Sequence, residues 1–227
     1  MEDLVSTMST AVPAIQAVAP AMLPAQPTGV PSTTIRIIGA VDDVTAHRFY
    51  QLYLETFGEL AIRAVNRHLL RRDEFMAVMV DPRIDKIVIE DDETHELIAM
   101  CTLTKHLETV DWVSPEYFAH HYPDHWARGA VYYLGFSLVA SRRRRSQLFS
   151  ELISTVTRIV VANDAMCSYD ICMFNNETIG LSDAVNTIVT STANVDVRAV
   201  DTQTYYAAVP VVTSEEFLRL PQPRSTV

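Results

Sequence analysis

The sequence predicts an α/β (α+β) protein in which a mixed, mostly antiparallel central sheet is flanked by helices. Three observations lead to this prediction. Strand-like and helix-like segments alternate from residue 34 to residue 213. Two strand-like runs near residues 86–105 are separated by a short polar turn, which is typical of a hairpin. A long apolar run at 131–139 leads, through four arginines, into an amphipathic helix.

Composition excludes several function classes. The net charge of −10 disfavours a nucleic-acid binder, because affinity for nucleic acid comes from many phosphate contacts. The three cysteines form no C-x-x-C pair, so we expect neither a disulfide framework nor a metal site. No run approaches the roughly 20 apolar residues of a membrane span, and Glu2 and Asp3 stand where a secretion signal carries basic residues. The expectation is a cytoplasmic protein that binds neither nucleic acid nor membrane.

The chain is predicted to consist of one folded domain between two tails. Residues 1–33 are rich in alanine and proline, with five prolines between positions 13 and 31, and are predicted to be a disordered tail. The domain is expected to span 34–213, and residues 214–227 to form a second loose tail.

The first half of the domain is predicted to contain a strand, two helices and a strand hairpin, in that order. Residues 34–39 predict a strand, and Asp42 and Asp43 offer an N-cap for a helix over 44–56. Apolar residues at helical spacing predict a second helix over 60–71. Residues 86–90 and 97–105 are then expected to pair as a hairpin.

An aromatic and histidine-rich insertion is predicted at 106–128. Ser114 followed by Pro115 is a good helix start. Pro123 stands between His121 and His125, which argues against one helix presenting both to a metal ion. We interpret this segment as an aromatic lid over a small-molecule pocket.

The second half of the domain is predicted to begin with a strand over 131–139 and a helix over 146–161, whose apolar stripe includes Leu152 and Val156. A further strand over 169–174, a helix over 181–190 and a closing hairpin of 195–200 with 204–211 complete the predicted order.

The four arginines at 142–145 stand at the start of a predicted helix. Cations are unfavourable at a helix N-terminus, where unpaired N–H groups carry partial positive charge. A bound anion would relieve that conflict, and the alternative is a solvated charge run. The pattern favours a phosphate site, with Arg144 and Arg145 nearest to the helix.

The order of elements, together with the run from Val139 to Phe149, resembles the GCN5-related N-acetyltransferase superfamily. In that family a pattern like Val-x-Pro-x-x-Arg/Gln-x-x-Gly-x-Gly/Ala follows the fourth strand, and its backbone wraps the pyrophosphate of coenzyme A. Val139 and Arg144 match this pattern, whereas Gln147 and Phe149 replace its two small residues. Asn175 and Asn176 match an asparagine that follows the fifth strand, but Ser182 and Asp183 stand near the position of the tyrosine that protonates the leaving thiolate.

The resemblance implies an acyl-coenzyme A-dependent N-acyltransferase, most simply an acetyltransferase that uses acetyl-CoA or another acyl-CoA and a small-molecule amine acceptor. A homodimer is compatible with this interpretation. The implied cofactor-binding positions are Ser137, Leu138, Val139, Arg144, Arg145, Ser146, Gln147, Leu148, Phe149, Asn175 and Asn176.

Direct attack by an amine needs a group that takes up its proton. Near the expected pocket the candidates for this catalytic role are His106, Glu108, Asp111 and Tyr133. Two alternatives stay open at this point. One is the transfer of a longer acyl chain, as in acyl-amino-acid or autoinducer synthases. The other is a binding or regulatory module that has kept the fold without catalysis.

Overall fold

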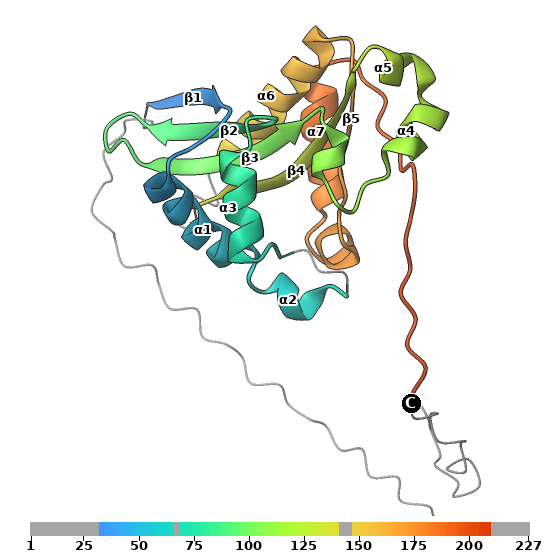
Figure 1. The fold of residues 1–227 in the computed structure, drawn as a ribbon, viewed down its shortest axis with the longest axis horizontal. Helices are drawn as coiled ribbons and strands as arrows, with labels where there is room; N and C mark the ends of the chain where they lie inside the picture. Colours follow the sequence, from blue (N-terminus) through green and yellow to red (C-terminus); the bar gives the residue numbers. More distant parts are fainter. Residues whose placement is uncertain (1–31, 66–68, 141–146, 210–227) are drawn as a thin grey trace, which may run out of the picture. The chain divides into compact units, whose positions relative to one another are not determined.

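The computed structural model describes residues 32–65, 69–140 and 147–209. In this part of the chain five strands form one sheet in the order β1-β2-β3-β4-β5 (Figure 1). Strands β1 to β4 pair with one another in antiparallel fashion, and β5 pairs with β4 in parallel. The predicted fold class is confirmed. The strands are β1 (Thr33–Ile38), β2 (Ile84–Asp91), β3 (Leu97–Thr104), β4 (Val131–Val139) and β5 (Met166–Ser168).

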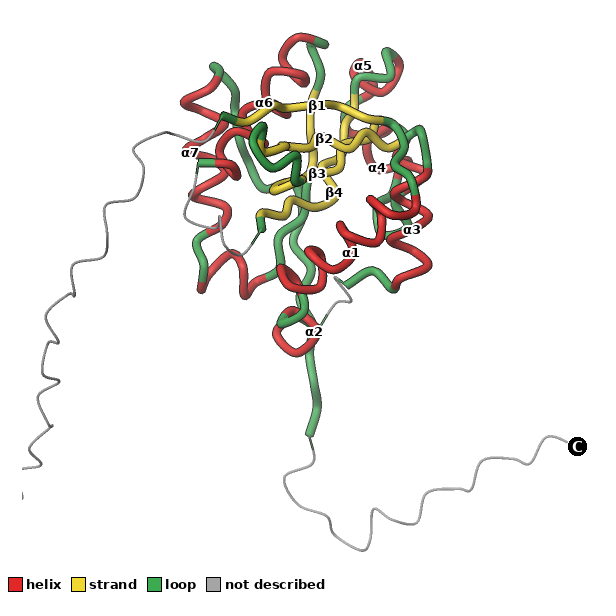
Figure 2. Tube along the Cα trace, turned by 90° about the vertical axis from the view of Figure 1, so that its left-hand side faces the viewer, coloured by secondary structure: helices red, strands yellow, loops and turns green. Residues whose placement is uncertain are grey.

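Helices cover both faces of this sheet. Figure 2 shows α6 and α7 on one side of the strands and α1 and α3 on the other. Short helices α4 and α5 lie near the end of β4 where the strand begins, as Figure 1 shows. The helical elements are α1 (Asp43–Phe57), α2 (Leu60–Arg63), α3 (Arg72–Val80), the 3-10 turn η1 (Leu107–Thr109), α4 (Pro115–His121), α5 (Pro123–Ala127), α6 (Leu148–Ala162), the π-helical turn η3 (Phe174–Thr178) and α7 (Leu181–Thr192).

Two apolar layers follow from the alternation of side chains along the strands. Ile87 and Cys101 face α6 and α7, where they pack with Leu152 and Val185. Val88 and Met100 face the opposite side, where α1 and α3 cover them. Each fully buried aliphatic side chain contributes roughly 1.5–3 kcal/mol to stability. The sheet is therefore held rigidly from both faces, which fixes the position of β4.

The predicted helix starts at Asp42 and Ser114 are confirmed. The Asp42 carboxylate accepts a hydrogen bond from the Thr45 N–H at 3.0 Å, and it caps α1. The Ser114 hydroxyl accepts one from the Tyr117 N–H at 3.3 Å, with Pro115 in the first turn of α4. The N-cap carboxylate also has a lowered pKa, because the bonds from Thr45 stabilise its charged form.

The predicted helix over 60–71 is wrong in extent. Helix α2 ends at Arg63, because Ala64 turns to an extended conformation with φ −123° and ψ 135°. A separate helix, α3, then begins at Arg72, where we predicted none. Its start is stabilised by the Glu74 carboxylate, which accepts a hydrogen bond from the Arg71 N–H at 2.7 Å.

Two strand predictions in the C-terminal third are also wrong. The fifth strand covers Met166–Ser168 and not 169–174, and Phe174 instead begins η3. Residues 195–209 form no strand, so the predicted closing hairpin is absent from the described part of the chain; positions 210 and 211 lie outside it. No helix among the described residues is long and apolar enough to cross a bilayer.

Candidate functional site

Strand β4 contains a bulge that changes the direction of its backbone groups. Before the bulge Leu134 is paired with Leu103, and after it Ser137 is paired with Cys101. Between these two pairs β4 advances by three residues while β3 advances by two. The extra residue in β4 defines a β-bulge at Gly135 and Phe136. The Phe136 N–H donates to the Thr102 hydroxyl at 3.2 Å in place of a ladder bond.

Beyond the bulge the N–H groups of Ser137 and Val139 face away from β3. The Ala140 N–H donates to the Ile98 carbonyl at 2.8 Å, so Ala140 bonds toward β3. Backbone groups alternate between the two edges of an antiparallel strand. In this register, with Val139 opposite Ala99, the N–H groups of Val139 and Ser137 therefore point to the β5 side.

Strand β5 does not reach these groups. Its pairing with β4 is restricted to Val131–Tyr133 opposite Met166–Ser168. Among the described residues no strand pairs with the β5 side of residues 137–139. We call this opening, bounded by Ser137–Val139 of β4 and by the chain after Ser168, the β4–β5 fork. The fork presents strand N–H groups that no described strand pairs with, and an extended ligand can bind such groups by strand addition.

The predicted cofactor-binding residues fall into three groups. The first group, which borders the fork, consists of Ser137, Leu138 and Val139. The Ser137 hydroxyl oxygen is buried opposite Cys101, and it makes no hydrogen bond of normal geometry to a described residue. Burial raises the pKa of the Cys101 thiol, which makes it an inert neighbour. The predicted phosphate-binding residues Arg144, Arg145 and Ser146 lie outside the described residues.

The remaining cofactor-binding candidates surround the start of α6 and η3. Gln147 is exposed and precedes the first residue of α6, while Leu148 is buried in the layer beneath α6 and Phe149 packs against that layer. In the sequence, the first residue of α6 comes three positions after Arg145, the last residue of the arginine run. Asn175 and Asn176 lie in η3, where the Asn176 N–H donates to the Cys172 carbonyl at 2.9 Å.

A small hollow adjoins the bulge on the α1 and α3 side of the sheet. Its free volume is about 30 Å³. Its walls combine aromatic rings, aliphatic side chains and threonine hydroxyls. The lining residues are Leu70, Val78, Ile84, Thr102, Thr104, Thr109, Val110, Trp112, Tyr133, Gly135 and Phe136.

Tyr133 joins this hollow to the base of the fork. It is 2% exposed, and its hydroxyl accepts a hydrogen bond from Trp112 Nε1 at 2.9 Å. The same hydroxyl donates to Asp170 Oδ1, which Trp112 Nε1 also approaches at 3.3 Å. Burial, strengthened by the nearby Asp170 carboxylate, raises the Tyr133 pKa. Tyr133 is therefore a hydrogen-bond donor at neutral pH, and it is not suited to act as a base.

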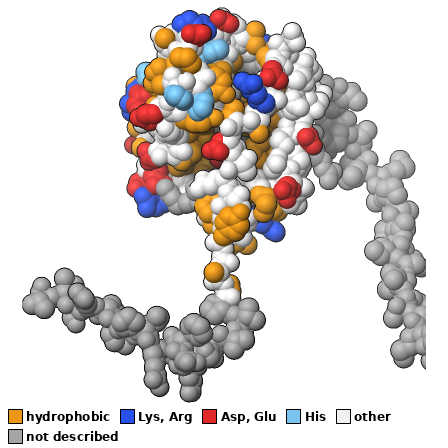
Figure 3. Space-filling model, turned by 90° about the vertical axis from the view of Figure 1, so that its right-hand side faces the viewer, with side chains coloured by type: hydrophobic (Ala, Val, Ile, Leu, Met, Phe, Trp, Pro, Cys, Tyr) orange, Lys and Arg blue, Asp and Glu red, His pale blue; other side chains and the backbone are white. Residues whose placement is uncertain are grey.

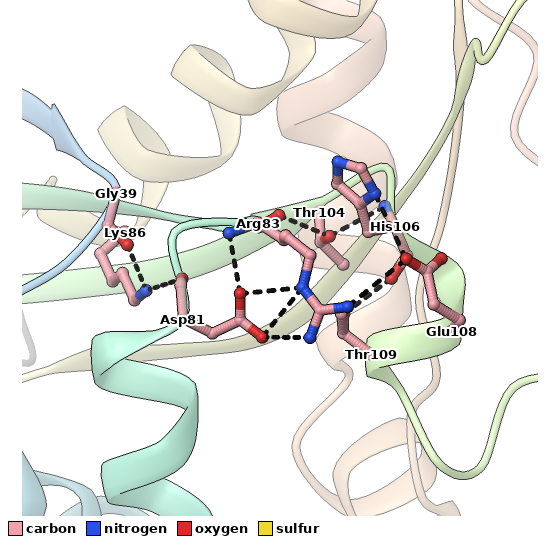
Figure 4. Close-up of polar contacts among 8 residues, drawn as sticks. All are labelled: Gly39, Asp81, Arg83, Lys86, Thr104, His106, Glu108 and Thr109. Atoms are coloured by element: carbon pink, nitrogen blue, oxygen red, sulfur yellow. Dashed lines mark hydrogen bonds and ion pairs between the residues drawn. The ribbon is translucent and has the colours of Figure 1, made fainter.

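The other catalytic candidates are not assembled with Tyr133. His106 Nδ1 lies 3.3 Å from Glu108 Oε1, and Arg83 Nη1 lies 3.7 Å from the same carboxylate (Figure 4). Arg83 Nη2 also donates to Asp81 Oδ2 at 2.6 Å, and it holds the Asp81 pKa at about 2. Neither His106, Glu108 nor Asp111 lines the hollow. These contacts form a separate network beyond the end of β3.

The sequence interpretation missed Asp170, which the structure places beside Tyr133 and Trp112. It is separated from them by 37 and 58 positions, so no local motif could have indicated the cluster. The surface on the α4 and α5 side is shown in Figure 3, where apolar side chains are exposed among acidic, basic and histidine side chains.

The solved structures that resemble this fold include N-acetyltransferases. One is an aminoglycoside acetyltransferase from an uncultured soil metagenomic sample, with 12% identity over 78% of this chain and 96% of that chain, at a TM-score of 0.43. A ribosomal-protein-alanine N-acetyltransferase from Brucella melitensis shows 12% identity over 79% of this chain and 100% of its own, at 0.45.

A third is an aminoglycoside antibiotic 6'-N-acetyltransferase from Acinetobacter baumannii, with 13% identity over 78% of this chain and 100% of that one, at a TM-score of 0.45. No protein-family model matches the sequence. A comparison with curated proteins likewise finds no match.

Proposed function

We propose that the protein is an acyl-coenzyme A-dependent N-acyltransferase, most simply an acetyltransferase that acts on a small amine. One observation carries this proposal: the N–H groups of Ser137 and Val139 point into the β4–β5 fork. An extended, amide-containing chain such as the pantetheine arm can accept hydrogen bonds from strand N–H groups spaced two residues apart. The element order that resembles the N-acetyltransferase superfamily supports the same function.

In this proposal the phosphate end of coenzyme A lies toward the start of α6. The 15-residue helix α6 begins at Leu148, three positions after the last of the arginines that the sequence predicts to bind phosphate. A helix N-terminus and arginine side chains both stabilise phosphate charge. The pantetheine arm would then run from this end along Val139 and Ser137, toward the bulge.

The reaction joins an amine nitrogen to the acyl carbon. The amine attacks the thioester carbonyl, the carbonyl oxygen gains negative charge, and the C–S bond breaks as the thiolate leaves. An N–H group in the fork would stabilise the charged oxygen. The proton lost by the amine passes to solvent or to the leaving thiolate. Tyr133 remains protonated throughout and serves in this account to hold Asp170.

The proposal is tested by incubating the protein with acetyl-CoA and a panel of small primary amines, and by following free thiol release together with product mass. We expect thiol release that depends on an amine, and a product heavier by one acetyl group. Isothermal titration with coenzyme A separates the alternatives. Binding without transfer to any amine would favour a non-catalytic module, and the absence of binding would contradict the proposal.

Acyl-chain length is tested by mass spectrometry of ligands retained on purification under native conditions. An acetyl-CoA or free coenzyme A species agrees with the simplest form of the proposal. A retained long-chain acyl-CoA would instead support the longer-chain alternative, while leaving the class of reaction unchanged.

A further inference from the structure

We propose that β1 is the contact strand of a symmetric homodimer, in which the β1 edge of one copy pairs in antiparallel fashion with the β1 edge of a second copy. The two sheets then form one continuous sheet across a two-fold axis. This inference does not depend on the proposed acyltransferase function, because β1 and the side of α6 that faces it lie outside the β4–β5 fork.

Strand β1 is the end strand of the sheet, so one of its edges has no pairing partner among the described residues (Figure 1). The β1–β2 register continues to Ser32 and Asp92, where the Asp92 N–H donates to the Ser32 carbonyl at 3.0 Å. Opposed residues of an antiparallel ladder alternate between pairs that exchange hydrogen bonds and pairs whose backbone groups point outward. The residues of β1 that turn their N–H and C=O groups to the open edge are therefore Thr33, Ile35 and Ile37.

The same residues present an apolar surface on the α6 side of the sheet. Ile35 and Ile37 lie opposite Ile89 and Ile87, which belong to the layer beneath α6. Those two partners are buried, whereas Ile35 is 38% exposed and Ile37 is 52% exposed. Arg36, the only charged residue of β1, has its side chain on the other face. The α6 side of β1 therefore carries none of the charges with which natural edge strands prevent association.

Antiparallel pairing of two β1 edges has its centre at Ile35. With Ile35 opposite Ile35 of the second copy, Thr33 of each copy faces Ile37 of the other, and the outward backbone groups of all three residues are paired. Arg36 then faces Thr34 of the second copy, so no like charges are directly opposed. A two-fold axis through the Ile35 pair generates a closed, isologous dimer, which does not continue into a filament.

Helix α6 provides a second layer beside this axis. A hollow with a free volume of about 130 Å³ lies between β1 and the outer side of α6. Its lining residues are Ile35, Gln147, Ser150, Glu151, Ser154 and Arg158. Because Ile35 lies at the centre of the proposed pairing, the hollows of the two copies meet at the axis. They form one groove above the paired strands, and the two α6 helices are its walls.

The charges on this side of α6 are self-complementary. Glu151 and Arg158 stand about two helical turns apart, and both line the hollow. Ser154 lies between them, and its short side chain leaves space above the strands. The two-fold axis reverses the direction of α6, so Glu151 of each copy faces Arg158 of the other across the groove. This charge complementarity favours a second copy of the chain over an unrelated partner.

Sedimentation velocity of the full chain over a range of concentrations tests the proposal. We expect a dimer whose share rises with concentration. Ile37→Lys places a charge on the contact edge and should raise the dimer dissociation constant by at least about tenfold. The matched control is Ile62→Lys, at an exposed isoleucine of α2, which should associate like the parent. A parent that stays monomeric would overturn the inference, and the edge would then be left to another part of the chain or to a different partner.

Charge variants of α6 distinguish this dimer from one that forms through another face. Glu151→Lys makes both walls of the groove basic, and Arg158→Glu makes both acidic. Each variant alone should raise the dissociation constant by at least about tenfold, because like charges then face each other. Circular dichroism checks that both are folded.

A mixture of these two variants should associate again as a heterodimer, because a basic wall then faces an acidic one. The double variant Glu151→Lys/Arg158→Glu should likewise recover the affinity of the parent. A purely structural effect of either substitution would not be reversed by mixing. A dissociation constant that is the same for the parent, both single variants and the mixture would contradict the inference, because the dimer would then use another surface.

Discussion

Thr102 and Phe136 are joined across β3 and β4 by a hydrogen bond from a backbone N–H to a side-chain hydroxyl, at 3.2 Å. This bond replaces a ladder bond at the point where β4 bulges. Because of the bulge, odd-numbered residues of β4 beyond it turn their N–H groups to the β5 side. The Thr102–Phe136 contact therefore stabilises the backbone direction on which the fork depends.

Gly135 is required for this contact. A Cβ atom added there would lie 2.7 Å from Thr102 Oγ1, closer than carbon and oxygen approach without a bond. We expect Gly135→Ala to lower the free energy of unfolding by about 1–3 kcal/mol. Urea denaturation measures this. The double variant Gly135→Ala/Thr102→Ala removes the clash and should be less destabilised than the sum of the single variants; strict additivity would contradict the account.

The burial of Lys86 leads us to predict that its contribution to the stability of the fold rises at alkaline pH. Its side chain is buried, and Nζ donates to the Gly39 and Asp81 carbonyls, at 2.7 Å each (Figure 4). Burial lowers its pKa from 10.5 to about 8. Between these values the unfolded chain holds a proton that the folded chain does not. Linkage then requires the lysine's contribution to stability to rise with pH across this window.

We therefore compare the free energy of unfolding of the parent with that of Lys86→Met. Between pH 8 and 10.5 we expect the difference to change in favour of the parent by about 3 kcal/mol, because one pKa unit corresponds to roughly 1.36 kcal/mol. Urea denaturation at several pH values measures it. Lys105→Met, at an exposed lysine just after β3, is the matched control and should show no such trend. A difference that is flat with pH for Lys86→Met would refute the account of its burial.

The arginine run gives a third prediction, which rests on the sequence alone. Arg144→Ala combined with Arg145→Ala should weaken coenzyme A binding by on the order of a hundredfold, because each charge-assisted hydrogen bond contributes about 1.5–3 kcal/mol. Isothermal titration measures the affinity, and the thermal midpoint should match that of the parent. If the double variant keeps the parent's affinity, the arginines do not bind the phosphates.

The elements with clear periodicity could be predicted from the sequence. The strand at 131–139 was predicted with the observed bounds, and α6 within two residues, because apolar alternation and a helical stripe are unambiguous there. Helix α3 was missed because its cap uses Arg71 and Glu74, and the sequence carries no serine, threonine, aspartate or asparagine at that cap. The apolar run at 169–174 is too short for periodicity to separate a strand from a helical turn.

The candidate site was less predictable than the fold. Tyr133, Ser137 and Val139 follow from their place on β4, whereas Asp170 depends on where the chain goes after it leaves β5. The bulge at Gly135 and Phe136 depends on the register between β3 and β4, which residues in sequence order do not reveal. The incorrect hairpin at 195–211 has the same cause, because alternation alone does not supply a pairing partner.

Coenzyme A titration of two proline variants tests the central claim, that the Ser137 and Val139 N–H groups serve a ligand and not the sheet. Val139→Pro removes an N–H that faces the fork, whereas Leu138→Pro removes one that faces β3. The account predicts that Val139→Pro stays folded by circular dichroism and loses coenzyme A affinity, while Leu138→Pro fails to fold. A folded Val139→Pro protein that binds coenzyme A as tightly as the parent would contradict it.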